Sequence, residues 1–86
     1  MIQRDQEQMI TPGQMRAARA LLGISQSDLA RAADVSVPTI KRAESDAANA
    51  SAVATETRAR IEAALEAAGV EFTNGATPGL RLKARS

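Results

Sequence analysis

The sequence predicts a small, mainly α-helical domain of four to five helices that ends in a short β-hairpin. Apolar residues recur at helical spacing in four stretches, and three of these are preceded by a Ser or Thr that can cap a helix. After Gly69 the pattern changes to alternation between apolar and polar residues, in two short runs separated by turn signals. At 86 residues the chain has room for one small domain.

The composition excludes several classes of function. Neither Cys nor His occurs, so disulfides, zinc fingers and imidazole bases are ruled out, and no metal or other cofactor is expected. The Ser and Asp residues that could act in catalysis have capping roles instead, so an enzyme is not expected. Phe72 is the single aromatic residue, which argues against an RNA or single-strand binder. No apolar run is long enough to predict a membrane partner.

The charge is unevenly distributed, although the net charge is only +1. Residues 11–45 hold five basic and three acidic side chains, whereas residues 46–72 hold two basic and five acidic ones. Three further basic residues follow, namely Arg81, Lys83 and Arg85. Modest local basicity of this kind fits sequence-specific binding of double-stranded DNA better than bulk coating of a polyanion. The basic residues near the C-terminus are expected to form a solubilising edge or, alternatively, a DNA-binding arm.

The first helix is predicted over residues 11–22. Thr11 can cap it, Pro12 suits its first position, and Gln14 can reach back to close a capping box. Its core-facing residues are expected to be Met15, Ala18, Leu21 and Leu22. Arg16 lies on another side, where either contact with a phosphate or simple solvation is possible.

Two short helices joined by a tight turn are predicted next. Ser25 can form a capping box with Asp28 at the start of one, Asp34 breaks the pattern, and Ser36 caps the other. The residues expected to face inward are Leu29, Ala30, Ala33, Ile40 and Ala43. Because small residues let two helices cross closely, this pattern predicts a helix-turn-helix.

A fourth helix is predicted from Thr55 to Ala68. Its apolar stripe comprises Ile61, Ala64, Leu65 and Ala68. Arg58, Glu62 and Glu66 are expected on its outer face, at spacings that allow surface pairs.

The alternating runs Val70–Phe72 and Leu80–Lys83 predict a β-hairpin with a loop of about seven residues. A lone two-stranded hairpin is marginally stable in water, so it must pack on the helices or pair with another chain.

The residues of the helix-turn-helix resemble those of the Cro/xenobiotic-response-element (XRE) family of phage repressors and bacterial regulators. The matching residues are Gly23, Ile24, Ser25, Gln26, Leu29, Ala30, Ala33, Val35, Ser36, Thr39, Ile40 and Glu44. The resemblance covers roughly residues 11–68 and implies a lambda-repressor-like DNA-binding domain. The chain departs from the family pattern in four respects. Asp34 replaces the usual turn glycine, and Ala43 replaces a bulkier residue. The outward face carries Val37 and Pro38 in place of amides, and the hairpin lies outside the core family pattern.

The resemblance implies a role for each exposed residue of the motif. Contacts to base edges are implied for Val37, Pro38 and Arg42, with the first two suited to a thymine methyl and Arg42 to guanine. Contacts to the DNA backbone are implied for Gln26, Ser36, Thr39 and Lys41. A partly buried structural ion pair is implied between Arg19 and Glu44. The plain alternative for the outward residues is a solvated helix face.

Four segments are expected along the chain. Residues 1–10 are a flexible N-terminal extension, residues 11–68 the helix-turn-helix domain, residues 69–83 the hairpin and residues 84–86 a tail. The hairpin is the expected dimerisation element, through Val70, Phe72, Leu80 and Leu82.

The predicted function is a cytoplasmic bacterial transcriptional regulator, more specifically a repressor. Its expected partner is double-stranded DNA, a pseudo-palindromic operator that it binds as a homodimer through the major groove. The alternative is a DNA-binding antitoxin, or a protein-interaction module of a phage or mobile-element switch.

Overall fold

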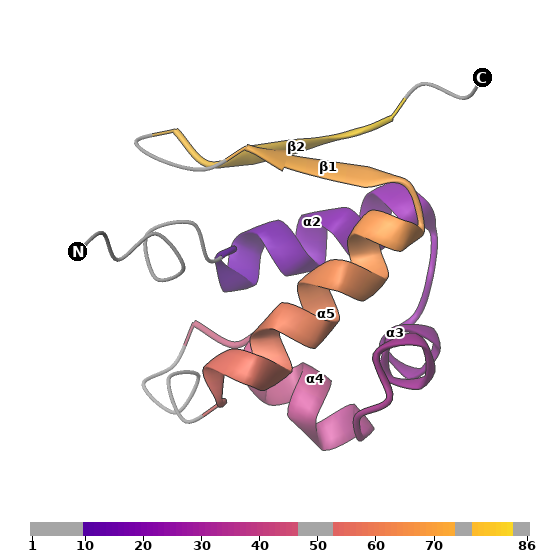
Figure 1. Ribbon diagram of the computed structural model, residues 1–86, viewed down its shortest axis with the longest axis vertical. Coiled ribbons are helices and arrows are strands. Elements are labelled where there is room, and N and C mark those ends of the chain that lie inside the picture. The colour runs from indigo at the N-terminus through magenta and orange to yellow at the C-terminus, as the bar shows by residue number, and fades with distance from the viewer. Residues whose placement is uncertain (1–9, 47–52, 74–76, 84–86) are drawn as a thin grey trace.

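The computed structural model describes residues 10–46, 53–73 and 77–83 of the chain. Within them, four helices and two strands follow one another: α2 (Pro12–Leu22), α3 (Gln26–Ala33), α4 (Val37–Ala43), α5 (Thr55–Ala67), β1 (Val70–Thr73) and β2 (Gly79–Leu82). Helices α2 and α5 lie in the middle, with the hairpin on one side of them and α3 and α4 on the other (Figure 1). The predicted fold class, mainly α with a C-terminal hairpin, is confirmed. None of the helices in these residues is long and apolar enough to cross a membrane.

Helices α2, α3 and α4 begin at the predicted caps. The Thr11 N–H donates to Gln14 Oε1 at 2.8 Å, and Thr11 Oγ1 accepts from the Gln14 N–H at 3.1 Å. Ser25 and Asp28 form the same reciprocal box, and Ser36 caps α4 through its hydroxyl. The hydrogen bonds of Ser25, chiefly the one from its backbone N–H, hold the pKa of Asp28 below its ordinary value.

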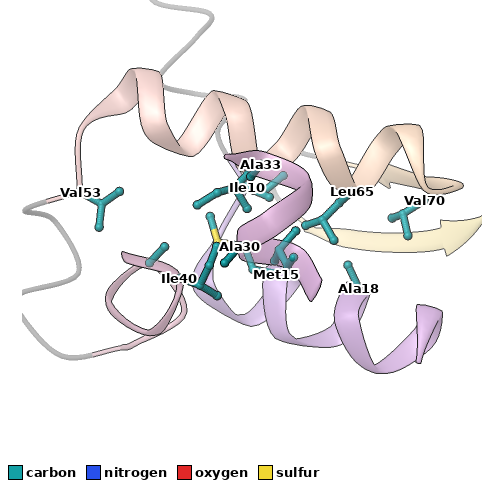
Figure 2. Packing of buried hydrophobic residues seen from close by; sticks show 12 residues of the cluster. Ile10, Met15, Ala18, Ala30, Ala33, Ile40, Val53, Leu65 and Val70 are labelled. Carbon is teal, nitrogen blue, oxygen red and sulfur yellow. The ribbon is translucent and has the colours of Figure 1, made fainter. Parts of the chain in front are cut away.

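The core lies between the four helices and the inner face of the hairpin. Its buried apolar members are Ile10, Met15, Ala18, Leu29, Ala30, Ala33, Ile40, Ala43, Val53, Ile61, Leu65 and Val70. Figure 2 shows Met15, Ala30 and Leu65 converging from three helices. The inward residues predicted for the helix-turn-helix are all among them, and the exchange of a bulky residue for Ala43 leaves that side chain fully buried.

Two residues predicted for the core are exposed instead. Leu21 is 47% exposed, because at 100° per residue it lies about 120° around the helix from Met15. Leu22 lies about 20° from Met15 and is partly buried against the core. Ala68 is also exposed, at the C-cap of α5.

Two residues predicted for the outside are buried. Ile10, assigned to the N-terminal extension, is 2% exposed and belongs to the core, while residues 1–9 lie outside the described part of the chain. Arg58, expected on the outer face of α5, is 9% exposed, because it lies one turn before the buried Ile61 and shares its side of the helix.

The hairpin packs on α2 and α5 as a flat cover. Its antiparallel register pairs Val70 with Leu82 and Phe72 with Leu80 on the inner face. The strands extend to Thr73 and begin at Gly79, which leaves a shorter loop than predicted. The side chain of Gln14, buried at 5% exposure, donates from Nε2 to the carbonyl oxygens of both residues at 2.9 Å. One amide therefore joins the first turn of α2 to both strands.

Glu62 and Glu66 lie one turn apart on α5. Partial burial, followed by repulsion from Glu66, raises the pKa of Glu62 above its ordinary value. The folded chain therefore binds this proton more tightly than the unfolded chain does. Stability consequently falls as the pH rises from the ordinary pKa through the raised one.

Replacing Glu62 by Gln should therefore raise the melting temperature at neutral pH by about 1–3 °C, since like charges four residues apart cost about 0.2–0.5 kcal/mol. The gain should vanish below the ordinary glutamate pKa, because Glu62 is then protonated and as neutral as the Gln that replaces it. Melting curves of both chains from acidic to neutral pH measure this. Glu56→Gln, in the first turn of the same helix, is the control and should be slightly destabilising, because an acidic side chain there is favourable. A gain from Glu62→Gln that is independent of pH would contradict the assignment.

Candidate nucleic-acid interface

The outward face of α4 carries the residues predicted to contact DNA. Pro38, Lys41 and Arg42 are exposed, and Pro38 and Arg42 lie four residues apart, which places them on one side of the helix. Thr39 is half-buried, and its hydroxyl lies 2.8 Å from that of Ser36, while the Ser36 hydroxyl also caps the helix. Val37 is partly buried against the core, so it is the least outward of the predicted contact residues. The helix lies on the side of the molecule away from the hairpin (Figure 1).

The turn between α3 and α4 contains a non-glycine residue whose backbone adopts the left-handed conformation. Asp34 has φ 60° and ψ 49°, and the next N–H, that of Val35, donates to Ala30 O at 2.9 Å. Arg60 from α5 donates to the carbonyl oxygen of Asp34 at 2.9 Å and to its carboxylate at 3.2 Å. The departure from the family glycine is thus accompanied by a contact from another helix.

Replacing Asp34 by Ala should lower the free energy of unfolding by about 1 kcal/mol, because Ala tolerates the left-handed region poorly. Asp34→Gly is the matched control, since it loses the same carboxylate contact with Arg60 but adopts positive φ freely. We expect the glycine variant to remain within about 0.5 kcal/mol of the parent, because an exposed ion pair contributes little. Urea denaturation of the three chains measures the difference. Equal destabilisation by Ala and Gly would show that the Arg60 contact, not the backbone, dominates.

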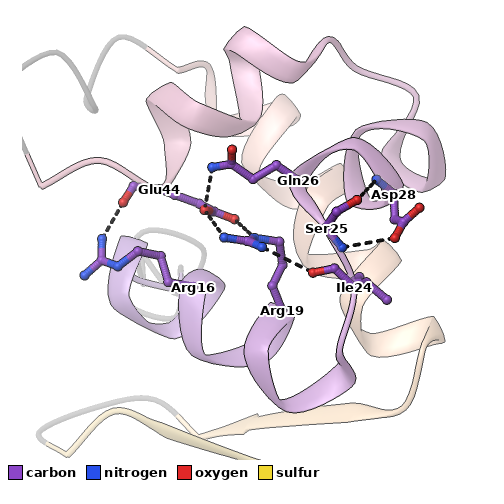
Figure 3. A network of polar contacts seen from close by, with 7 residues as sticks. All are labelled: Arg16, Arg19, Ile24, Ser25, Gln26, Asp28 and Glu44. Carbon is purple, nitrogen blue, oxygen red and sulfur yellow. Dashed lines mark hydrogen bonds and ion pairs between the residues drawn. The ribbon is translucent and has the colours of Figure 1, made fainter.

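The end of α4 is fixed by a buried carboxylate (Figure 3). Glu44 is 4% exposed and accepts from Arg19 of α2 twice, from Nε at 2.6 Å and from Nη2 at 3.1 Å. Gln26, the first residue of α3, donates from Nε2 to the same carboxylate at 3.1 Å. Arg19 also donates to the carbonyl of Ile24, which joins the network to the connection before α3. Three helices therefore meet at Glu44, and the pairing of Arg19 with Glu44 occurs in a partly buried setting.

Arg16 of α2 also contacts the C-terminal end of α4. Its Nη1 donates to the backbone carbonyl of Glu44, and its Nη2 lies 3.1 Å from Asp46 Oδ2. A cation at the C-terminal end of a helix is favourable because the last carbonyl groups carry partial negative charge. Arg16 is thus not merely solvated, because it contacts the end of α4, and the phosphate contact stays a prediction.

The side-chain amide of Gln26 can donate hydrogen bonds to two acceptors. One of its N–H groups is directed to Glu44, but an amide nitrogen has two, so the second can serve a phosphate. The structure therefore brings Gln26, Arg19 and Glu44 together, and separates them from the exposed group of Pro38, Lys41 and Arg42.

The predicted dimerisation residues do not share one environment. Val70 is fully buried, and Phe72 and Leu80 are partly buried against the core of their own chain. Leu82 is 48% exposed. Of the four, Leu82 is the one that offers substantial apolar surface to another molecule.

Comparison with known families matches residues 15–53 to the family described as helix-turn-helix. The matched residues include most of α2, all of α3 and α4, and the turn at Asp34. Residues 15–53 are a helix-turn-helix domain of the Cro/XRE type. No curated protein matches the chain. A helix-turn-helix domain of this type binds DNA, so the chain is a DNA-binding regulator.

Three side chains that support the helix-turn-helix domain were not predicted from the sequence. The sequence predicts the capping role of Gln14 but not its link to the hairpin, and it gives no signal of the contact between Arg60 and the turn. For Arg16 the sequence predicts other roles. All three act across 26 or more residues of sequence, beyond the reach of helical spacing.

Proposed function

We propose that this chain is a transcriptional repressor that places α4 in the major groove of an operator. The observation that supports the proposal is that α4 exposes one face to solvent while its C-terminal end is anchored in the domain. Its outward residues Pro38, Lys41 and Arg42 are exposed, whereas its end is held by the buried Glu44. A recognition helix needs both, since base discrimination requires side chains presented at a fixed depth and angle.

The proposed roles follow from the chemistry of the side chains. The Arg42 guanidinium suits the two acceptors of guanine, and the ring of Pro38, with the accessible part of Val37, suits a thymine methyl. Lys41, Gln26 and the hydroxyls of the α4 cap suit phosphates, which position the helix without reading sequence.

We further propose that the regulator acts as a homodimer in the bacterial cytoplasm. One helix of seven residues offers few base contacts, and specific sites are usually read by two such helices. Two copies related by a two-fold axis require half-sites about one helical turn apart, so the operator should be a pseudo-palindrome.

Chromatin immunoprecipitation with sequencing, using a tagged copy in the native host, tests the proposal. We expect sharp peaks that share an inverted repeat, with half-site centres about 10 base pairs or a multiple apart. Transcripts next to the peaks should rise when the gene is deleted, as repression requires. A flat profile at normal expression would contradict the proposal and favour the protein-interaction alternative.

A further inference from the structure

A groove of about 560 Å³ lies where the C-terminal ends of α2 and α5 meet the end of β2. Leu21, Leu22 and Leu82 supply its apolar surface, while Glu66 and Lys83 supply its charged groups. Leu21 and Leu82, at 47% and 48% exposure, are the large apolar side chains that stand exposed in the described part of the chain. Both line this one groove. We call these five residues the Leu21–Leu82 groove.

The exposure of the two leucines has local causes. Leu21 lies off the buried stripe of α2, and Leu82, the partner of Val70 in the register, is the last residue of β2. Exposed leucines are ordinary on protein surfaces when they are scattered, whereas these two line the same groove.

The two charges of the groove come from different elements. Glu66 belongs to α5, and Lys83 follows β2. Within residues 10–46, 53–73 and 77–83, neither takes part in an ion pair. Glu66 also lies one turn after Glu62, which repels it, so a cation placed here would relieve that repulsion. Among the described residues, the groove therefore has one anion and one cation without an ion pair beside an apolar centre.

A surface that carries both charges beside an apolar centre can be complementary to itself. In a two-fold contact every pair of residues occurs twice, once on each side of the axis. Lys83 of one copy can therefore face Glu66 of the other on both sides. The leucines of the two copies then bury one another in the centre. A surface with charge of one sign would instead repel its own copy.

The position of the groove leaves α4 free. It adjoins the hairpin, whereas α4 lies on the other side of the molecule (Figure 1). A second hollow of about 390 Å³ continues from Leu82 and Lys83 onto Glu71 and Arg81. Those two residues form an ion pair at 2.9 Å on the outer face of the hairpin. The contact surface can therefore extend along the strand without involving the recognition helix.

We propose that the Leu21–Leu82 groove is the surface on which a second copy of this chain docks. The inference rests on the proposed function in so far as that function requires a dimer. It differs from the sequence-based expectation, because Val70, Phe72 and Leu80 pack inward and Leu21 of α2 joins Leu82 in their place.

Sedimentation of the full chain over a range of concentrations tests the proposal. Leu82→Ser should raise the dimer dissociation constant about 30-fold, because each of the two copies loses the burial of about half a leucine. Leu21→Gln should act in the same way. Ala63→Ser, at an exposed position of α5 outside the groove, is the control and should leave the constant unchanged. Circular dichroism of every variant should match the parent, since both leucines are half exposed already.

A charge exchange tests the two-fold arrangement itself. Lys83→Glu and Glu66→Lys should each weaken the dimer about tenfold, since each places like charges together twice. The double variant should return to within about threefold of the parent, because the pairs are restored with reversed sign. This recovery cannot arise from misfolding of the single variants.

The outcomes separate this inference from the proposed function. A parent chain that stays monomeric, a Leu82→Ser variant that dimerises as the parent does, or a double variant that fails to recover would each overturn the inference. Binding of a labelled mixed-sequence DNA duplex at low salt is measured alongside, because phosphate contacts do not need the dimer. If even the parent fails to bind this duplex, the proposed function is wrong whatever the sedimentation shows.

Discussion

Glu44→Ala should lower the free energy of unfolding by about 3 kcal/mol, with a fall in melting temperature of about 15 °C. The side chain of Glu44 is 3% exposed and that of Arg19 22% exposed. Removing the carboxylate would leave the Arg19 guanidinium largely out of water with no anion beside it. The Gln26 amide would lose an acceptor as well. Breaking a buried pair on one side costs more than the pair contributes, because the remaining group is desolvated without compensation.

Glu44→Gln provides the matched control. It keeps the shape of the side chain and one carbonyl oxygen that can accept an N–H, but it removes the charge. We expect about half the loss of the alanine variant. Thermal and urea denaturation of the full chain measure both. If Glu44→Ala melts within a few degrees of the parent, then the carboxylate does not hold the three helices as described.

Arg42→Ala should weaken binding to the operator by about 1–3 kcal/mol, or roughly 5- to 150-fold, and relax base preference at one position of each half-site. The Arg42 side chain is exposed, so the melting temperature should stay within about 2 °C of the parent, as for most surface substitutions. Fluorescence anisotropy with the operator and its single-base variants measures affinity and preference together.

Lys41→Ala is the control for Arg42→Ala, because it removes a neighbouring positive charge on the same helix. A phosphate contact should be lost uniformly across sequences, and the slope of log affinity against log salt should fall by about 1. Unchanged binding of Arg42→Ala to operator and unrelated DNA alike would show that another residue reads the bases.

The elements whose signals lie close together in the sequence could be predicted. The boxes at Thr11–Gln14 and Ser25–Asp28 span three residues, and the bonds predicted for them are present. The inward faces of α3 and α4 follow helical spacing and were also predicted correctly. These patterns suffice because capping and helix periodicity are local properties.

Two errors concern residues whose side of the helix already follows from helical spacing. Leu21 is apolar, but it lies about 120° around α2 from Met15 and is exposed. Arg58 is charged, but it lies one turn before Ile61 and is buried with it. The burial of Gln14, in contrast, could not be predicted from local spacing. Gln14 is buried because two strands more than fifty residues away present their carbonyl groups to it. Composition cannot supply that geometry.

The support of α4 and its outward surface use different side chains. Glu44 anchors the end of the helix through its bonds with Arg19 and Gln26. The outward residues Pro38, Lys41 and Arg42 take no part in these bonds. Substitutions on the outward surface should therefore carry little penalty in folding, and on the proposed function they should change the preferred operator while leaving the scaffold intact. Transplanting the exposed residues of a relative onto this helix should accordingly rewrite its target sequence without redesign of the domain.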